Sequence, residues 1–447
     1  MIQFRCGRCG QAVYFENVRC GQCDALLGYL PGERCMGAFE ADEAAGTDTA
    51  AAEGGTPAPA QAGAAVRWRR VGDGCAGAGD FFTPCANRVQ HDVCNWMLDP
   101  GDAGPLCRSC RLTAVIPDLT VAGNKTRWAA IEAAKRRLMF TLIDHGLDPE
   151  PKTSPADTKG LALHLLAAVP GGPAVMTGHA NGVVTINIAE ADDVEREATR
   201  VAFGEPVRTL LGHLRHEFGH YLQQRWITGP AAEACRAVFG DEREDYAAAL
   251  ARYHAEGPPA DWQQRFVSAY ASAHPFEDWA ETCAHVLLVS DAVQTAETWG
   301  LRLDGPMARA RPRSSRSQPM DRVVIEHWLP VAQFLNAMNR SLGLRDGYPY
   351  LMPDAVLQKM AAVQRLLADA ARRRRAAAAR RLRGQAARTA RAAGSEPSEA
   401  PSDATAAPAA DEASPGSAGS AADAAADGAA DSAVAAAPAP APATTAG

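Results

Sequence analysis

Five residues near the middle of the chain, His216-Glu217-Phe218-Gly219-His220, restrict its fold more than any other feature. Two histidines four residues apart on a helix differ by about 40° around its axis, because each residue turns the helix by about 100°. Both imidazoles then point toward one spot and can bind one metal ion. Glu217 lies one step round the helix, where it can reach a metal-bound water without becoming a ligand. The motif therefore predicts a helix that carries His216 and His220 as zinc ligands and Glu217 as a general base.

The residues on either side of this motif favour a helix in a protein core. Apolar residues recur at the three- and four-residue spacing of one helix face, namely Val207, Leu210, Leu211, Leu214, Phe218, Tyr221 and Leu222. Pro206 suits a first helical turn, and Gly229-Pro230 suits a helix end. We therefore expect the helix to begin near Glu205. The alternative is a surface helix with two solvated histidines.

A catalytic zinc site needs a third protein ligand, and residues 270–285 contain two candidates. This segment is typical of a loop that ends at Pro275 and is followed by a helix. Glu277 and Glu281 are four residues apart and share a face, so one carboxylate can bind the metal while the other orients a ligand histidine. An acidic helix start, which the helix dipole favours, also accounts for Glu277 but not for the apolar residues around Glu281.

The first 23 residues contain a second strong pattern, C-x2-C-x10-C-x2-C, formed by Cys6, Cys9, Cys20 and Cys23. Four thiolates in two such turns suit tetrahedral Zn2+. An iron site of the rubredoxin type has a similar spacing and is the alternative. Disulfides are less favoured, because the chain begins with Met and has no signal-peptide pattern, which predicts the reducing cytosol.

A second group of cysteines with looser spacing follows. Its four candidate zinc ligands are Cys85, Cys94, Cys107 and Cys110. His91 is an alternative ligand, and Cys75 is left over. A set of buried free cysteines with one accidental pair is the other interpretation. The remaining cysteines, which we expect to be unpaired and packed as small apolar groups, are Cys35, Cys235 and Cys283.

The motif around His216, followed some fifty residues later by Glu277-Asp-Trp-Ala-Glu281, resembles the gluzincin metallopeptidases. The lethal-factor-like and Pro-Pro endopeptidase branches look most similar. This resemblance implies that Glu277 is the third zinc ligand and that Glu281 supports a ligand histidine from behind. It also implies that Tyr270, seven residues before Glu277, helps to hold the developing oxyanion. The exchanged assignment, with Glu281 as the ligand, stays open.

Residues 1 to 365 as a whole are similar to the bacterial zinc-binding metallopeptidases that carry a zinc-ribbon head. The motifs that carry this resemblance are the paired cysteine groups, Leu112–Leu119, Arg127-Trp128, Ile131–Leu138, the histidine motif, Phe239–Tyr246 and the Glu277 segment. The resemblance implies hydrolysis of peptide bonds in a peptide or protein substrate. It also implies one catalytic zinc ion and one or two structural zinc ions. It does not indicate which substrate is cleaved.

Composition divides the chain into six segments. They are a zinc ribbon (1–37), a flexible insert (38–65), a second zinc-ribbon-like module (66–119), a catalytic domain (120–365), an Ala/Arg-rich helical extension (366–393) and a disordered tail (394–447). After Phe39 the insert has no bulky apolar residue, and the tail has no aromatic residue, so neither can bury enough apolar surface to fold. We expect an α+β protein whose catalytic domain is zincin-like, mainly helical and built on a small mixed sheet.

Two segments of the catalytic domain are typical of strands. Residues 161–166 and 183–188 are rich in Leu, Val and Ile, and Asn181-Gly182 favours a tight turn, so we expect the two strands to form a hairpin. Zincins bind peptides by strand addition to an edge strand above the active-site helix. We expect Val183 to Ile188 to be that strand, with an ordinary sheet strand as an equal alternative.

Several other residues are candidates without a motif of their own. The charged run from Asp241 to Tyr246 is either a brace for the metal site or substrate, or a solvated helix start. Candidates that we expect to have structural roles are Tyr253, His254, His274 and His285.

Charge and hydropathy limit the partners. Residues 372–391 contain nine arginines and no acid, so nucleic acid or an acidic partner is a candidate, although a solvated helical extension is favoured. The net charge of −7 argues against nucleic-acid binding by the whole protein. The sequence contains no run of 18 apolar residues, so it predicts no membrane span. The zinc ribbon is a candidate docking site for a protein partner.

Two other functions are compatible with these patterns. One is a zinc-ribbon protein that binds a partner or nucleic acid and carries an inactive protease body. The other is a zinc amidase that acts on a non-protein amide.

Overall fold

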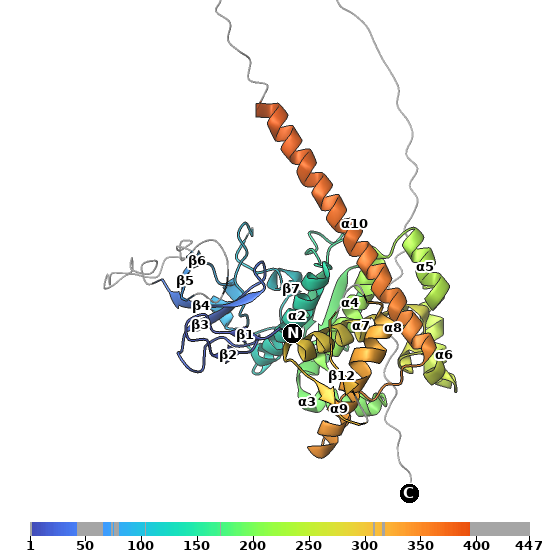
Figure 1. Ribbon diagram of the computed structural model, residues 1–447. Helices are drawn as coiled ribbons and strands as arrows, with labels where there is room; N and C mark the ends of the chain where they lie inside the picture. Colours follow the sequence, from blue (N-terminus) through green and yellow to red (C-terminus); the bar gives the residue numbers. More distant parts are fainter. Residues whose placement is uncertain are drawn as a thin grey trace, which may run out of the picture. The chain divides into compact units, whose positions relative to one another are not determined.

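The computed structural model describes residues 2–42, 66–72, 75, 80–102, 104–169, 171–306, 309–314 and 318–393 (Figure 1). The N-terminal elements are β1 (Phe4–Arg5), β2 (Ala12–Val13), β3 (Leu26–Leu30), β4 (Cys35–Ala41), β5 (Trp68–Arg70), β6 (Phe81–Phe82) and α1 (Ala86–His91). The central elements are β7 (Thr113–Val115), α2 (Asn124–His145), β8 (Ala162–Leu166), β9 (Gly178–Ala180), β10 (Val183–Asn187), α3 (Asp193–Ala202) and α4 (Leu210–Trp226). The last ones are α5 (Pro230–Phe239), α6 (Tyr246–Glu256), α7 (Pro275–Thr298), β11 (Leu303–Asp304), β12 (Arg309–Ala310), α8 (Met320–Val323), α9 (Leu329–Ser341) and α10 (Asp354–Ala393). This mixture of helices and small sheets confirms the predicted α and β content.

The segment that follows the first cysteine group and the segment that precedes the second share one sheet, although the sequence suggested separate modules. Strands β3, β4, β5 and β6 form an antiparallel sheet in that order, so residues from both sides of the segment 43–65 pair with one another. β4 continues to Ala41, and strand structure therefore enters the first residues of the predicted insert. The rest of the insert lies outside the described residues.

Aromatic side chains join this sheet to the long helix α2. The ring of Tyr29 lies 5.0 Å from that of Trp96 and 4.9 Å from that of Phe15. Phe15 in turn contacts Phe140 of α2 at 5.5 Å. All four side chains are buried, so the zinc-ribbon region and α2 share a continuous hydrophobic core.

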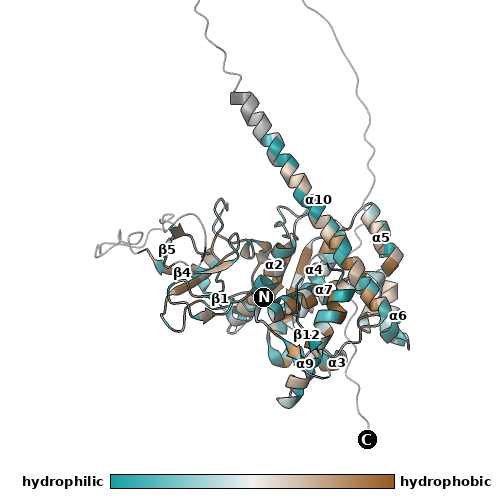
Figure 2. Cartoon of the chain, viewed as in Figure 1, coloured by the Kyte–Doolittle hydropathy of each residue, from teal (hydrophilic) through white to brown (hydrophobic). Residues whose placement is uncertain are grey.

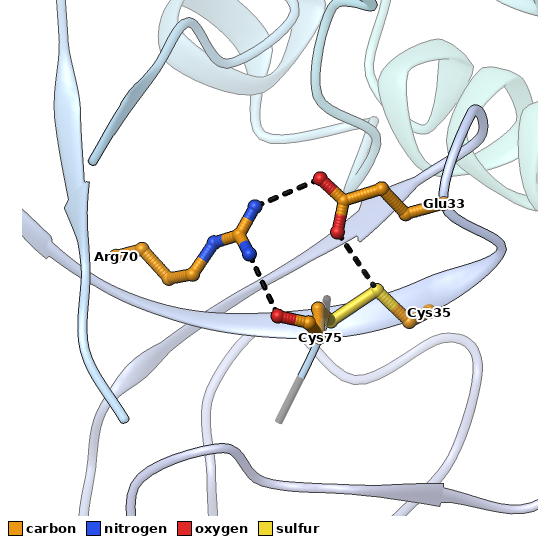
Figure 3. The surroundings of a disulfide bond; sticks show 4 residues. All are labelled: Glu33, Cys35, Arg70 and Cys75. Carbon is orange, nitrogen blue, oxygen red and sulfur yellow. Dashed lines mark hydrogen bonds and ion pairs between the residues drawn. A yellow bond between two sulfur atoms is a disulfide. The ribbon is translucent and has the colours of Figure 1, made fainter. Parts of the chain in front are cut away.

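Cys35 and Cys75 form a disulfide, and the prediction that Cys35 is unpaired and Cys75 left over is wrong (Figure 3). Cys35 begins β4 and Cys75 follows β5, and the pairing of these two strands brings the two Cα atoms to 6.0 Å. Arg70 supports the pair, because its guanidinium bonds both the Cys75 carbonyl and the Glu33 carboxylate at 2.8 Å. Spacing along the chain did not reveal the pair, since strand pairing creates the contact.

This pairing predicts the result of a thiol titration. When the protein is denatured in the presence of a chelator but without reductant, a thiol reagent should modify ten of its twelve cysteines. After reduction, the reagent should modify all twelve. The double variant with Cys35→Ser and Cys75→Ser is the control, and it should show ten thiols under both conditions. Twelve reactive thiols in the unreduced wild-type protein would exclude the disulfide.

A four-stranded sheet with the order β7-β8-β10-β9 lies in the central part of the chain. β8 and β10 run parallel, so the predicted hairpin between residues 161–166 and 183–188 is wrong. β10 instead forms a hairpin with β9 through Asn181 and Gly182, which have φ angles of 49° and 76°. The expectation that 183–188 is an edge strand is also wrong, because β10 lies between β8 and β9, and β9 is one of the two edge strands. β9 reads Gly-His-Ala and has no strand pattern that could have indicated it.

Helices α4 and α7 pack directly against each other, and they carry the histidine motif and the Glu277 segment (Figure 1). Gly219 permits this close approach, since a Cβ there would lie 3.2 Å from the backbone of Ala280. The indole of Trp279 donates a hydrogen bond of 3.0 Å to the Gly219 carbonyl. The faces of α4 and α7 that carry the two motifs are therefore held at a fixed distance.

The ends of these two helices follow from capping residues. The Thr209 hydroxyl accepts a hydrogen bond from the Gly212 amide, so α4 begins at Leu210 and not near Glu205 as expected. α7 begins at Pro275 as predicted, and the imidazole of His274 caps it by accepting a bond from the Phe276 amide.

The C-terminal helix α10 extends from Asp354 to Ala393 and includes the arginine-rich block (Figure 2). The described residues up to Arg372 belong to one compact unit, and a second unit begins at Arg373. The predicted disordered tail, 394–447, lies outside the described residues. Among the helices of the described part of the chain, none is both long and apolar enough to cross a membrane.

Candidate metal centre

Three predicted ligands, two from α4 and one from α7, meet at one point. Nε2 of His216 lies 3.1 Å from Nε2 of His220 and 3.0 Å from Oε2 of Glu277. The distance from Nε2 of His220 to the same oxygen is 3.5 Å. Glu277 is 1% exposed, and its Oε2 makes no hydrogen bond. A buried carboxylate needs a compensating positive charge, and two imidazoles with one carboxylate are a ligand set that Zn2+ accepts. The residues present therefore fit a zinc ion.

Glu281 lies behind His216, on the side of the imidazole away from Glu277. Its Oε1 accepts a hydrogen bond of 2.7 Å from Nδ1 of His216, and its Oε2 accepts one of 2.7 Å from the Ser268 hydroxyl. A donor at Nδ1 leaves the Nε2 lone pair free to face a metal. Glu281 thus occupies the position of a supporting residue, and Glu277 that of a ligand. Ser268 was missed, because it belongs to no motif and reaches the site only through the fold.

Glu217 is buried beside the histidines but does not belong to the converging ligand atoms. It is 7% exposed, and its Oε2 has no hydrogen-bond partner. Burial raises the pKa of Glu217, while the neighbouring His216 and His220 act in the opposite direction. A carboxylate with a raised pKa next to a metal position can take up and release a proton.

Two tyrosines border the group. The Tyr246 hydroxyl donates a hydrogen bond of 2.7 Å to Oε1 of Glu277. The Tyr270 ring lies 6.2 Å from the His216 ring, and burial together with the charge of Glu277 holds the pKa of Tyr270 well above its usual value. Tyr270 is thus a neutral hydroxyl donor at the edge of the site.

Within the charged run 241–246, only the tyrosine contacts the metal-site residues. Asp241 and Glu242 form ion pairs with arginines, and Asp245 caps α6 by accepting a bond from the Ala248 amide. The acidic residues therefore agree with the interpretation of this run as the start of a helix. Tyr246 alone agrees with the interpretation of the run as a brace for the metal site. The family resemblance was the only sequence signal for it.

The other candidate residues lie outside the ligand group. Tyr253 and His254 pack against each other, and Tyr253 also contacts the Tyr270 ring at 5.9 Å. Nδ1 of His285 pairs with the Tyr348 hydroxyl at 2.8 Å, and burial lowers the pKa of His285 to about 4. These contacts agree with structural roles.

One residue without any sequence signal lies close to the site. His179 is on the edge strand β9, and its ring stacks 6.2 Å from that of His220. Burial, followed by the effects of His220 and Lys152, lowers the pKa of His179 to about 3. The edge strand therefore passes next to the second ligand histidine.

The first cysteine group converges as the spacing predicts. The Sγ atoms of Cys6 and Cys23 lie 3.7 Å apart, and those of Cys9 and Cys20 lie 3.6 Å apart. These distances match the roughly 3.8 Å between sulfurs of a tetrahedral site with Zn–S bonds near 2.3 Å.

The second group, Cys85, Cys94, Cys107 and Cys110, also converges, and all four side chains are buried. The Sγ atoms of Cys94 and Cys107 are 3.8 Å apart, and the Cys107 amide lies 3.4 Å from the Cys85 sulfur. The buried guanidinium of Arg136 interacts electrostatically with Cys94 and supplies a positive charge next to the thiolates. His91 packs on Trp128 and not in this cluster, so the four cysteines complete the set without it.

Comparisons with known proteins agree with this arrangement. Residues 124–366 match the family described as "Putative zinc-binding metallo-peptidase", and residues 3–121 match a zinc-ribbon domain. Relatives from Mycobacterium tuberculosis and Mycobacterium bovis, each described as an uncharacterized protein, are 37% identical over 373 residues. The alignment covers 83% of this chain and 96% of each relative. No solved structure matches the chain significantly.

The two matched models follow each other in the order of the cysteine groups and the histidine motif, as the resemblance of residues 1 to 365 predicted. The chain therefore belongs to this zinc-binding metallopeptidase family and carries the zinc-ribbon domain at its N-terminal end.

Proposed function

We propose that the chain is a zincin-like zinc metallopeptidase whose active site lies between α4 and α7. The observation that carries this proposal is the convergence of His216, His220 and Glu277, with the buried carboxylate of Glu217 beside them and its Oε2 without a hydrogen-bond partner. This is the arrangement of three protein ligands and one non-ligand base that zinc hydrolases use.

His216, His220 and Glu277 would hold the zinc ion. When bound, zinc supplies Lewis-acid chemistry, which lowers the pKa of water and polarises a carbonyl group. Glu217 accepts the proton of the attacking water and passes it to the leaving amine. Glu281, held by Ser268, keeps Nδ1 of His216 protonated and its Nε2 directed at the metal position. Tyr270 donates a hydrogen bond to the developing oxyanion.

The substrate peptide, in this proposal, pairs with β9. The carbonyl and amide groups along the outer side of an edge strand are available for strand addition. His179 of β9 stacks near His220, so a peptide aligned with this strand would pass the metal position. This assignment replaces the interior strand β10, whose two sides are already paired.

A peptide library analysed by mass spectrometry tests the proposed reaction. Purified protein is incubated with the library and, in parallel, with small acyl amides, before and after zinc removal by a chelator and after zinc is restored. We expect peptide cleavage that disappears on chelation and returns with zinc. Cleavage of acyl amides alone would replace the peptidase by an amidase, and no cleavage of either class by the zinc-loaded protein would contradict a hydrolase.

A further inference from the structure

The two oxygens of Glu277 have different surroundings. Oε2 faces Nε2 of His216 at 3.0 Å and Nε2 of His220 at 3.5 Å. Oε1 accepts the hydrogen bond of 2.7 Å from the Tyr246 hydroxyl. Glu277 is 1% exposed, so both oxygens lie inside the protein. One oxygen is therefore directed at the metal position, and the other is bound to Tyr246.

Tyr246 is itself held in a defined position. It is the first residue of α6, which Asp245 caps. The Tyr246 ring packs 5.2 Å from the ring of His274 and 6.4 Å from that of Phe276, which lie at the start of α7 immediately before Glu277. Nε2 of His274 also donates a bond of 3.2 Å to the Glu244 carbonyl, so the beginnings of α6 and α7 are fastened together. These contacts hold the Tyr246 ring beside Glu277.

A hydrogen bond to one carboxylate oxygen changes how that carboxylate binds a metal. An oxygen that accepts an O–H bond is a weaker ligand, so the carboxylate binds through the other oxygen alone. Two imidazoles and one carboxylate oxygen make three protein ligands, which leaves a fourth position for water. If both oxygens of Glu277 bound, this position would be crowded.

We propose that Tyr246 is a positioning residue that holds Glu277 as a one-oxygen ligand and so keeps the fourth coordination position open. This inference rests on the proposed zinc site at His216, His220 and Glu277. It separates the two tyrosines of the site. The Tyr246 hydroxyl donates to Glu277, whereas the Tyr270 hydroxyl makes no hydrogen bond with Glu277 and interacts with the Tyr246 hydroxyl instead.

Cobalt substitution tests the inference, because the visible spectrum of Co2+ reports its coordination number. The proteins compared are wild type, Tyr246→Phe and the matched control Tyr253→Phe, each loaded with Co2+; Tyr253 packs on the Tyr270 ring and has no contact with Glu277. The spectrum of cobalt-loaded His216→Ala, in which only the cysteine sites bind, is subtracted from each. The rate of zinc transfer to a chelator is measured on the same proteins.

We expect Tyr246→Phe to show the weaker bands of a five-coordinate ion and to bind zinc about 10- to 100-fold less tightly, the usual effect of removing a group that supports a ligand. Tyr253→Phe should keep the four-coordinate spectrum and the wild-type rate of zinc release. The phenylalanine ring retains the packing against His274 and Phe276, so a general loss of structure does not produce this result. A melting curve checks that point.

An unchanged spectrum and an unchanged rate of zinc release in Tyr246→Phe would overturn the role of Tyr246. Neither measurement depends on hydrolysis. A wild-type protein that binds cobalt at His216 but cleaves no peptide would contradict the proposed peptidase and leave the role of Tyr246 standing.

Discussion

We expect replacement of Glu217 by Gln to lower kcat about 10²- to 10⁴-fold, the range that follows the loss of a general base, and to leave the zinc content of the protein unchanged. Glutamine has nearly the shape of glutamate but cannot accept a proton at neutral pH. Glu217 lies outside the ligand group, so its replacement leaves His216, His220 and Glu277 in place. The measurement is kcat for a cleaved library peptide, together with the zinc content per chain.

The stability of this variant gives an independent check. Burial raises the pKa of Glu217, which means that the ionised form is disfavoured in the folded protein. A neutral amide at this position should leave the free energy of unfolding equal to or above that of the wild type. Glu195→Gln, on the exposed side of α3, is the control and should change neither property. Wild-type turnover in Glu217→Gln would remove Glu217 as the base.

Metal analysis should find three zinc ions per chain in the wild-type protein and two in each of His216→Ala and Cys6→Ala. The three groups of converging ligands share no residue, so each substitution should empty one site only. Cys235→Ala provides the matched control, because Cys235 is buried but belongs to none of the three groups, and it should keep all three ions.

The two losses should differ strongly in their effect on stability. A structural zinc site contributes on the order of 10–16 kcal/mol of binding free energy, which becomes folding free energy. Cys6→Ala should therefore strongly destabilise the β1–β2 segment around this site, whereas His216→Ala should remove the metal from a site held together by α4 and α7. Circular dichroism and melting curves measure the difference. Iron in place of zinc in the wild-type protein would favour the rubredoxin alternative, and three zinc ions in His216→Ala would contradict the catalytic site.

Sequence patterns predicted those parts of the site in which residues close together in the chain are brought together by a single helix or turn. The i, i+4 relation of His216 and His220 holds on any helix, and so does that of Glu277 and Glu281. The C-x2-C turns likewise bring two sulfurs together within four residues. The predicted start of α4 near Glu205 was wrong for an equally local reason, because the hydroxyl of Thr209 caps the helix and Pro206 lies before its first turn.

Contacts between distant segments could not be predicted in this way. The parallel pairing of β8 with β10, and hence the position of β9 at the edge, depends on how the chain crosses between strands. The Cys35–Cys75 disulfide depends on the pairing of β4 with β5. Neither Ser268 nor His179 belongs to a pattern, and each contacts the site from another element.

By itself, the sequence determined which residues can bind metal, because ligand chemistry and helical periodicity are properties of the residues and their spacing. The tertiary structure alone decided which oxygen of Glu277 faces the histidines, and that Tyr246 holds the other oxygen. The physical reason is that the packing of α4 on α7, with α6 fastened to the start of α7, sets these distances between atoms that lie 31 to 61 residues apart in the chain.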